Sequence, residues 1–433
     1  MIRCLLAVVC MYAFVAQAAV EYLPEQNVLW VKDYPAEWPC TPQLLARIDR
    51  VFGWGKVAYN DATDACTVTC HLWIGRNDGS DTYFQVGSDA HPKQTLIVNG
   101  NVRVYSTWLV GENPDIPHHR KRALGRVNRL TLGVKGQPGI TAQLLIDNRE
   151  RAGHTLIVGG FSGYTTKNYG GQLCVYNSTI APFGDARIGE GKRTQPVHCG
   201  GNDRLELVHA TVRGVRGLAF GRNLTRALVE GCQFDNCGIG FLGNYQKEIR
   251  GSTFTHCATA IIPGSRNPLV LYGCEFADNK LNWSVPYQRL VAIDCTVDSY
   301  DKGSYSTERS TFFISKRHVV VRVIDPAGKP VKRAAVRAVA PVEPAAGEFD
   351  QWHAVTGPDG RTPSPGSKGA LLLSEVLIRA AKEKGGQPTR VTYRYTMTAR
   401  ADKRAARLEG FAPSPDQTEI TLQLAAPAKP TTR

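Results

Sequence analysis

Arginine, asparagine and tyrosine recur in four short segments of the chain, one after each of four similar strand-like stretches. Arginine can pair with a carboxylate or a sulfate through two parallel hydrogen bonds. Asparagine can bond hydroxyl groups, and tyrosine offers an aromatic face. If the stretches stack, these side chains form one ridge that suits an anionic sugar polymer: Arg222, Asn223, Asn244, Tyr245, Arg266, Asn267, Tyr287 and Arg289. Ordinary turn residues are the alternative interpretation, because Asn and Gly are common in turns.

A second group of reactive residues lies where the spacing of the stretches changes. From Ile180 to Val212 one repeat takes 32 residues, which predicts an inserted loop. The loop would contain His198 and Asp203, and these are the acid–base candidates if the protein is an enzyme. Insertions in repeat proteins often gather on the binding face.

One loop could bind a metal ion. Asp78 and Asp81 lie in an Asn-, Asp- and Gly-rich segment, and their carboxylates are ligands that Ca²⁺ prefers. A plain turn is the alternative. Cysteine and histidine pairs at zinc spacing are absent from the sequence, as is an HExxH motif. We therefore expect no metal or cofactor beyond this calcium alternative.

The elements that must position these residues repeat every 20 to 22 residues between about Leu205 and Val297. Each repeat is too short for a pair of helices, so it predicts a coil of parallel strands stacked about 4.8 Å apart. Such strands bury their inner face only by stacking. The turn position holds residues that tolerate a left-handed backbone: Asn177, Gly231, Gly251, Gly273 and Asp294. An apolar position follows at Phe234, Phe254, Phe276 and Val297.

These repeats resemble those of right-handed parallel β-helix proteins of the pectin-lyase-like group, over about Val57 to Ser315. The resemblance implies an all-β fold, but the fold hosts many unrelated activities. Polysaccharide-cleaving members carry acidic groups on the outward positions of one strand stack. The corresponding outward positions here are expected to be Ala219, Gly240, Ala260 and Asn282, none of which is acidic or an arginine. This composition disfavours an enzyme of familiar type.

The N-terminus indicates export. Arg3, an apolar run from Leu5 to Ala16 and the sequence Ala16-Gln17-Ala18 form a signal-peptide pattern. No other apolar segment is long enough to span a membrane, so we expect a secreted or periplasmic protein. The net charge of +14 suits an anionic polymer or cell surface, and export makes nucleic acid an unattractive partner.

Ten of the twelve cysteines follow the signal segment. Cys237 and Cys257 occupy the same place in successive repeats, as do Cys274 and Cys295. One strand spacing lies within the reach of a disulfide, which an oxidising compartment permits. We nevertheless expect buried thiols, because cysteine packs well in such stacks.

Both ends of the chain differ from the repeats. Thr41-Pro42 begins an amphipathic helical pattern that stops at Gly53, and this helix would cap the coil. Near the C-terminus, Val323 to Val331 and Thr356 to Gly360 resemble segments of the carboxypeptidase-regulatory-like or transthyretin-like β-sandwich, which implies an accessory module. The expected divisions are 1–18 signal peptide, 19–56 cap, 57–317 β-helix, 318–426 β-sandwich and 427–433 disordered tail.

The sequence thus predicts an all-β protein: a right-handed parallel β-helix solenoid with a capping helix, followed by a small β-sandwich. We expect it to recognise an extracellular or envelope polysaccharide without catalysis. Two alternatives stay open: a polysaccharide lyase or glycoside hydrolase, and a structural or adhesive scaffold.

Overall fold

The computed structural model describes residues 19–35, 37–76, 81–105, 128–150, 153–159, 171–185, 187–189, 197–200, 204–216, 218–220, 226–237, 239–240, 248–263, 268–285, 289–306, 311–340, 351–381 and 386–426. Within these residues the protein is all-β, with one α-helix and one short 3-10 helix, η1 (Pro24–Gln26). The chain divides into two compact units. The first comprises 1–269, 275–286 and 297–304, and the second comprises 270–274, 287–296 and 305–433.

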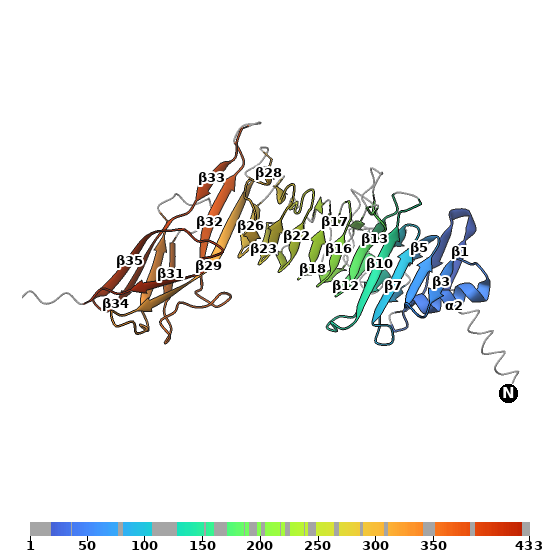
Figure 1. The fold of residues 1–433 in the computed structure, drawn as a ribbon, viewed down its shortest axis with the longest axis horizontal. Helices are drawn as coiled ribbons and strands as arrows, with labels where there is room; N and C mark the ends of the chain where they lie inside the picture. Colours follow the sequence, from blue (N-terminus) through green and yellow to red (C-terminus); the bar gives the residue numbers. More distant parts are fainter. Residues whose placement is uncertain are drawn as a thin grey trace, which may run out of the picture. The chain divides into compact units, whose positions relative to one another are not determined.

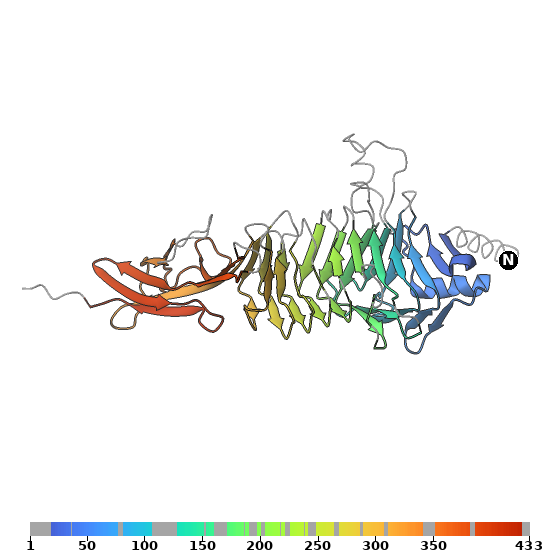
Figure 2. The same cartoon turned by 90° about the horizontal axis from the view of Figure 1, so that it is seen from above.

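Three sheets build the first unit (Figures 1 and 2). Sheet I contains β1 (Val20–Leu23), β2 (Val28–Val31), β5 (His71–Ile74), β8 (Val102–Val104), β11 (Leu156–Gly159), β14 (Val197–Gly200), β17 (Leu218–Phe220) and β20 (Ile239–Gly240). Sheet II contains β3 (Val57–Asn60), β4 (Ala65–Val68), β7 (Lys93–Val98), β10 (Thr141–Asp147), β13 (Thr179–Phe183), β16 (Thr211–Arg213), β19 (Gln233–Asp235), β22 (Thr253–Thr255), β24 (Glu275–Ala277) and β27 (Thr296–Val297). Sheet III contributes β6 (Thr82–Val86), β9 (Asn128–Leu132), β12 (Gly171–Tyr176), β15 (Arg204–Val208), β18 (Arg226–Glu230) and β21 (Glu248–Arg250). A further pair is β25 (Trp283–Val285) with β28 (Gly303–Tyr305).

Successive strands visit the three sheets in turn, so that a strand pairs with the one three places along the chain. Strand β12 lies between β9 and β15 in sheet III, β13 lies between β10 and β16 in sheet II, and all these pairs are parallel. Apolar side chains alternate into the interior, as the buried Leu173 and Val175 do in β12. The predicted all-β class and parallel pairing are therefore confirmed.

A left-handed turn joins sheet III to sheet II in repeat after repeat. The predicted positions all have positive φ, from 49° at Asn177 to 62° at Gly231, and Gly251, Gly273 and Asp294 lie between. His209 takes the same conformation at φ 51° and was not foreseen, because histidine is uncommon there. The backbone expectation is confirmed at every predicted turn.

Three of the four predicted apolar positions form a buried stack, whereas the fourth, Val297, is partly exposed. Phe234, Phe254 and Phe276 are in parallel register and each is at most 2% exposed. The expected thiols are also confirmed, since Cys237, Cys257, Cys274 and Cys295 are buried and form no disulfide. Cysteine Sγ atoms instead donate to backbone carbonyls, such as Cys237 to Val212 at 3.4 Å.

The N-terminal helix is α2 (Pro42–Phe52), and it forms as its end signals predict. The Thr41 side chain accepts from the backbone N–H of Leu44, Pro42 is the first helical residue, and Gly53 ends the helix at φ 66°. Leu45 and Ile48 are buried on its inner face.

The second unit contains two sheets around one apolar core. The first includes β23 (Leu269–Tyr272), β26 (Arg289–Ile293), β29 (Phe312–Ile324), β32 (Leu371–Arg379) and β33 (Thr389–Thr392), with β36 (Glu419–Gln423) paired to β29. The second runs β31 (Gln351–Val355), β30 (Ala335–Val339), β34 (Tyr395–Ala401) and β35 (Arg404–Phe411). Val321 and Leu373 from one sheet and Val336 and Met397 from the other belong to the same core cluster. Strand β29 runs through the expected boundary at 317/318 without a break.

Two details of the sequence interpretation were wrong. Ala260 and Asn282 do not face outward: they are 4% and 0% exposed. Asn282 is buried because its side-chain amide donates to Asp298 Oδ1 and to the backbone carbonyl of Ser299, both at 2.9 Å. Elsewhere, Cys66 lies in β4 and Cys70 in the bend before β5, because the chain turns at residues 69 and 70.

Candidate functional site

The predicted ridge falls almost wholly outside the described residues. This applies to Arg222, Asn223, Asn244, Tyr245, Arg266, Asn267 and Tyr287. Arg289 is described: it begins β26, is partly exposed, and its guanidinium lies over the Phe312 ring, 4.9 Å from the centroid. The ridge stays a prediction.

Of the two acid–base candidates, Asp203 lies outside the described residues, so its position relative to His198 is not described. His198 was expected in a loop but lies in strand β14 of sheet I, where its backbone pairs with Ile157 and Ala219. Of the calcium candidates, Asp78 lies outside the described residues and Asp81 within them. The described residues contain no group of three His, Cys, Asp or Glu side chains able to hold a metal ion.

An aromatic and basic surface occupies the outward face of sheet I, in the first strands of the chain. Parallel register places Trp30 of β2 beside Trp73 of β5, and Trp73 beside Arg103 of β8. Their neighbours along each strand, such as Leu72 and Val102, are fully buried, whereas Trp30, Trp73 and Arg103 are partly exposed. Adjacent strands lie about 4.8 Å apart, so the three residues span about 10 Å.

The rings of this surface pack against one another. Trp30 meets Trp73 edge-on with centroids 6.2 Å apart, and Trp73 meets Tyr105 edge-on at 5.4 Å. The Arg103 guanidinium lies over Tyr105, 4.4 Å from the ring centroid, and Lys32 Nζ lies 5.6 Å from that of Trp30. We call Trp30, Lys32, Trp73, Arg103 and Tyr105 the aromatic surface. Mutual packing fixes these rings before any ligand arrives.

Local hydrogen bonds hold the aromatic surface in place. The indole Nε1 of Trp30 donates to the Gly75 carbonyl at 2.7 Å, which anchors the ring to the turn after β5. The fully buried Asn128 donates its side-chain amide to the carbonyls of Arg76 and Tyr105, at 3.1 and 3.2 Å. Gly75 has φ 90°, and a Cβ there would lie 2.1 Å from the Asn128 side chain. Glycine is therefore required at this turn.

The charges at the aromatic surface are mainly positive. Lys32 pairs with Glu21 at 2.7 Å, whereas Arg103 forms no ion pair among the described residues and its Nε is buried without a hydrogen-bond partner there. Burial raises the pKa of Tyr105, and Arg103 opposes that shift. Arg103 can therefore offer N–H donors to an anionic ligand that lies against the rings.

An acid–base cluster lies on sheet II. The Asp64 Oδ1 atom accepts from the Tyr59 hydroxyl, from His91 Nδ1 at 3.0 Å and from Gln94 Nε2 at 3.2 Å. Burial and the bond to Asp64 raise the pKa of Tyr59 to about 12. None of these residues was among the predicted candidates, and no concave site is described around them.

Sheet III carries a charged cluster whose bonds are all internal. Glu206, 8% exposed, accepts from the Tyr176 hydroxyl and pairs with Arg204 at 2.5 Å and Lys135 at 3.3 Å. Burial raises the pKa of Glu206, but the Tyr176 and Arg204 bonds outweigh it and leave the pKa lowered. A carboxylate held ionised in this way is a poor general acid.

Sequence reasoning missed the aromatic surface because it searched the later repeats, where the period is clear. The signal was present: VLWV, HLWI and VRV each place one large outward residue between buried neighbours. Aligning these shorter runs would have placed the two tryptophans and the arginine in one row.

In the described part of the chain no helix is long and apolar enough to cross a membrane. Comparison of the whole chain with protein-family models, with curated protein sequences and with solved structures found no match.

Proposed function

We propose that this is an exported protein whose three sheets form a right-handed parallel β-helix, followed by a β-sandwich, and that it recognises an anionic polysaccharide without cleaving it. The order in which strands visit sheets III, II and I, with repeated left-handed turns, supports the β-helix. Two sheets around one core support the sandwich. Helix α2 contacts β3 and β4 at one end of sheet II, a position that suits a cap.

The aromatic surface is the observation that carries the proposal. Two partly exposed tryptophans offer their electron-rich faces to the C–H groups of a sugar ring, and the rings are already fixed by edge-on contacts. Arg103, which forms no ion pair among the described residues, adds positive charge beside them, whereas Lys32 near Trp30 is paired with Glu21. A row along successive parallel strands suits a linear polymer lying across the strands.

The distribution of acidic groups supports recognition rather than cleavage. The aromatic surface contains no carboxylate, and Glu21 beside it is occupied by Lys32. Hydrolysis of a glycosidic bond normally requires two carboxyl groups about 5–10 Å apart. The aromatic surface therefore lacks the pair of carboxyl groups that hydrolysis would need, and it suits binding alone.

The test uses calorimetry to measure how residues 19–433 bind four soluble polymers: polygalacturonate, alginate, a sulfated glycan and neutral dextran. We expect binding to the anionic polymers that weakens as salt rises, because exposed charges are screened. Trp73→Ala and Arg103→Gln should each weaken binding about tenfold, a loss of about 1.4 kcal/mol. Trp38→Ala and Arg213→Gln are the matched controls, since both residues are exposed and lie outside the aromatic surface.

Two results would contradict the proposal. Equal binding by Trp73→Ala and the parent protein would remove the aromatic surface as the site. New reducing ends or unsaturated uronate products would establish an enzyme, and His91→Ala would then ask whether the Asp64–His91 pair is involved.

A further inference from the structure

Strand β31 forms one edge of its sheet, with β30 as its only neighbour in the order β31-β30-β34-β35. The Thr356 N–H donates to the Ala334 carbonyl, and this bond shows which residue pairs of β30 and β31 exchange backbone hydrogen bonds. Pairs 336/354 and 338/352 therefore exchange the hydrogen bonds, and the backbone groups of His353 and Val355 point away from β30. Within the described residues no backbone bond is made by these outward groups.

The opposite edge of this sheet is protected by charge, whereas β31 is not. Strand β35 carries Arg404, Arg407 and Glu409, which discourage pairing with another chain. The sequence of β31 is Gln-Trp-His-Ala-Val, without an acidic residue, a lysine, an arginine or a proline. Val355 is 56% exposed, so its apolar side chain is free to contact a ligand.

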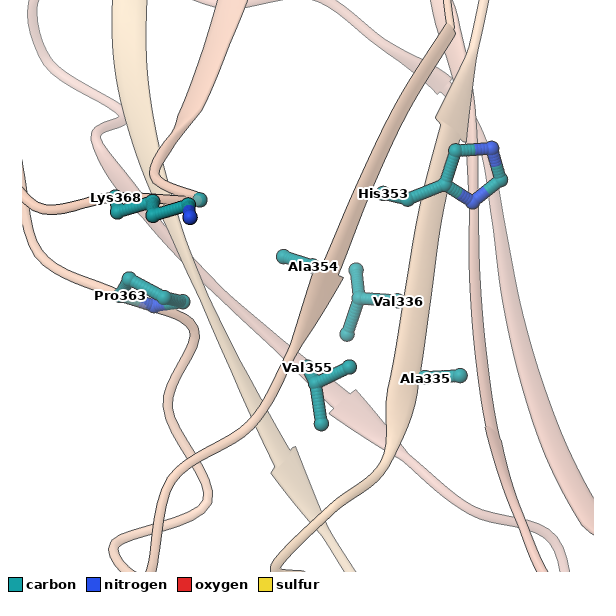
Figure 3. Close-up of a pocket in the computed structure, with 8 residues that line it drawn as sticks. Ala335, Val336, His353, Ala354, Val355, Pro363 and Lys368 are labelled. Atoms are coloured by element: carbon teal, nitrogen blue, oxygen red, sulfur yellow. The ribbon is translucent and has the colours of Figure 1, made fainter.

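A cavity of about 370 Å³ opens beside this edge. Its lining includes Ala354 and Val355 of β31 and Pro363 and Lys368 of the following loop. Figure 3 shows the loop residues on one side of β31 and Val336 of β30 on the other. The cavity therefore lies against β31, and Ala335 and Val336 of β30 also line it.

The charges around the cavity select the partner. Among the described residues that line the cavity are Lys368 and His353, and none of them carries a carboxylate. Lys368 is exposed and forms no ion pair among the described residues. Because a second copy of this edge would bring two Lys368 ammonium groups together, charge complementarity favours an acidic occupant.

We propose that β31 binds an extended acidic peptide of another protein by strand addition. The peptide backbone pairs with the outward groups of His353 and Val355, one apolar side chain enters the cavity, and a neighbouring carboxylate meets Lys368. Backbone bonds then supply affinity, and the cavity and Lys368 supply specificity. This site belongs to the second unit and does not depend on the proposed polysaccharide recognition.

The experiment selects phage from a random dodecapeptide library on immobilised residues 19–433. The enriched peptide is then synthesised with a fluorescein label, and its Kd is measured by anisotropy. We expect enriched sequences that alternate apolar residues and include Asp or Glu. Val355→Pro should weaken binding at least about tenfold, because it removes an outward N–H while leaving the bonds to β30 intact.

Matched variants separate the contacts from the fold. Val355→Thr keeps the N–H and should bind more tightly than Val355→Pro. Lys368→Ala should weaken binding, whereas Lys332→Ala, an exposed cation outside the cavity, should not. Circular dichroism and thermal unfolding confirm that each variant is folded.

Three outcomes of the peptide experiment would overturn the proposal. These are failure to enrich any peptide, enrichment of basic peptides, and binding unaffected by Val355→Pro and Lys368→Ala in folded protein. Sedimentation that shows a dimer dissolved by Val355→Pro would also overturn it, because the edge would then hold a second copy of the chain.

Discussion

Phe254 lies face to face with Phe234, with ring centroids 4.9 Å apart and ring planes inclined by 8°. Phe276 covers the other face of Phe254 at 5.0 Å. We predict that Phe254→Ala lowers the free energy of unfolding by about 3–5 kcal/mol, because it opens a cavity between two rings that cannot close together. Urea unfolding followed by circular dichroism measures the loss. Thr253→Ala, a partly exposed neighbour, should change stability by less than about 0.5 kcal/mol.

The pair Asp235–His256 should make stability depend on pH. His256 Nδ1 lies 2.7 Å from Asp235 Oδ1, and this bond raises the pKa of His256. Burial raises the pKa of Asp235, but the bonds from His256 and Thr255 outweigh it and lower the pKa.

The sign of the pH effect follows from these two shifts. The histidine contribution is complete below its unfolded pKa of about 6.5 and is lost as pH rises through the folded value. The aspartate contribution is present above about 3.9 and is lost as pH falls through its folded value. His256→Asn, which tolerates the left-handed backbone, should therefore lower Tm more at pH 5.5 than at pH 8.5. A larger difference at pH 8.5 would contradict the assignment.

Gly133 and Gly251 should respond very differently to alanine, although both have positive φ. A Cβ at Gly133 would lie 2.1 Å from the backbone carbonyl oxygen of Tyr176, whereas one at Gly251 meets nothing closer than 3.9 Å. We predict that Gly251→Ala costs about 1–2 kcal/mol, from backbone strain alone. Gly133→Ala should cost more, because the strand carrying Tyr176 must move. Chemical unfolding of the two variants side by side tests the difference, and equal costs would show that the contact is relieved cheaply.

Removing one partner of the buried pair Arg317–Glu375 should lower the free energy of unfolding strongly, whereas replacing both partners with apolar residues should lower it little. Arg317 Nε lies 2.9 Å from Glu375 Oε2, with side chains 4% and 10% exposed. Arg317→Met should destabilise by about 3–5 kcal/mol, because Glu375 is left buried without its ion-pair partner, whereas the double variant with Glu375→Leu should recover most of the loss. As a control, Arg361→Met breaks an ion pair about half exposed and should cost less than about 1 kcal/mol. A double variant as unstable as Arg317→Met would contradict the explanation.

Much of the fold could be predicted from local residue chemistry. Gly231 and Gly251 marked turns because few residues tolerate their backbone, and Thr41, Pro42 and Gly53 marked the helix because each satisfies a specific need at its end. The alternation of Tyr393, Tyr395 and Met397 gave a buried face, and all three side chains are fully buried.

Other features depend on contacts that no local pattern contains. Asn282 seemed outward by its place in the repeat, but its bonds to Asp298 and Ser299 draw it inside. Trp30, Trp73 and Arg103 are separated by 43 and 30 residues, and only the strand register brings them into one row. The outward edge of β31 similarly depends on which strands pair, which its five residues do not specify.

The offset between paired strands also bears on how the chain reaches this state. Phe234 pairs with Phe254 and Leu207 with Val229, so in this part of the chain the paired strands are 20 or 22 residues apart. Closing such short loops costs little entropy, and the cost is similar for each of these strands. Each strand here can therefore add to an edge already formed, and the rate at which this part folds should depend weakly on the number of strands.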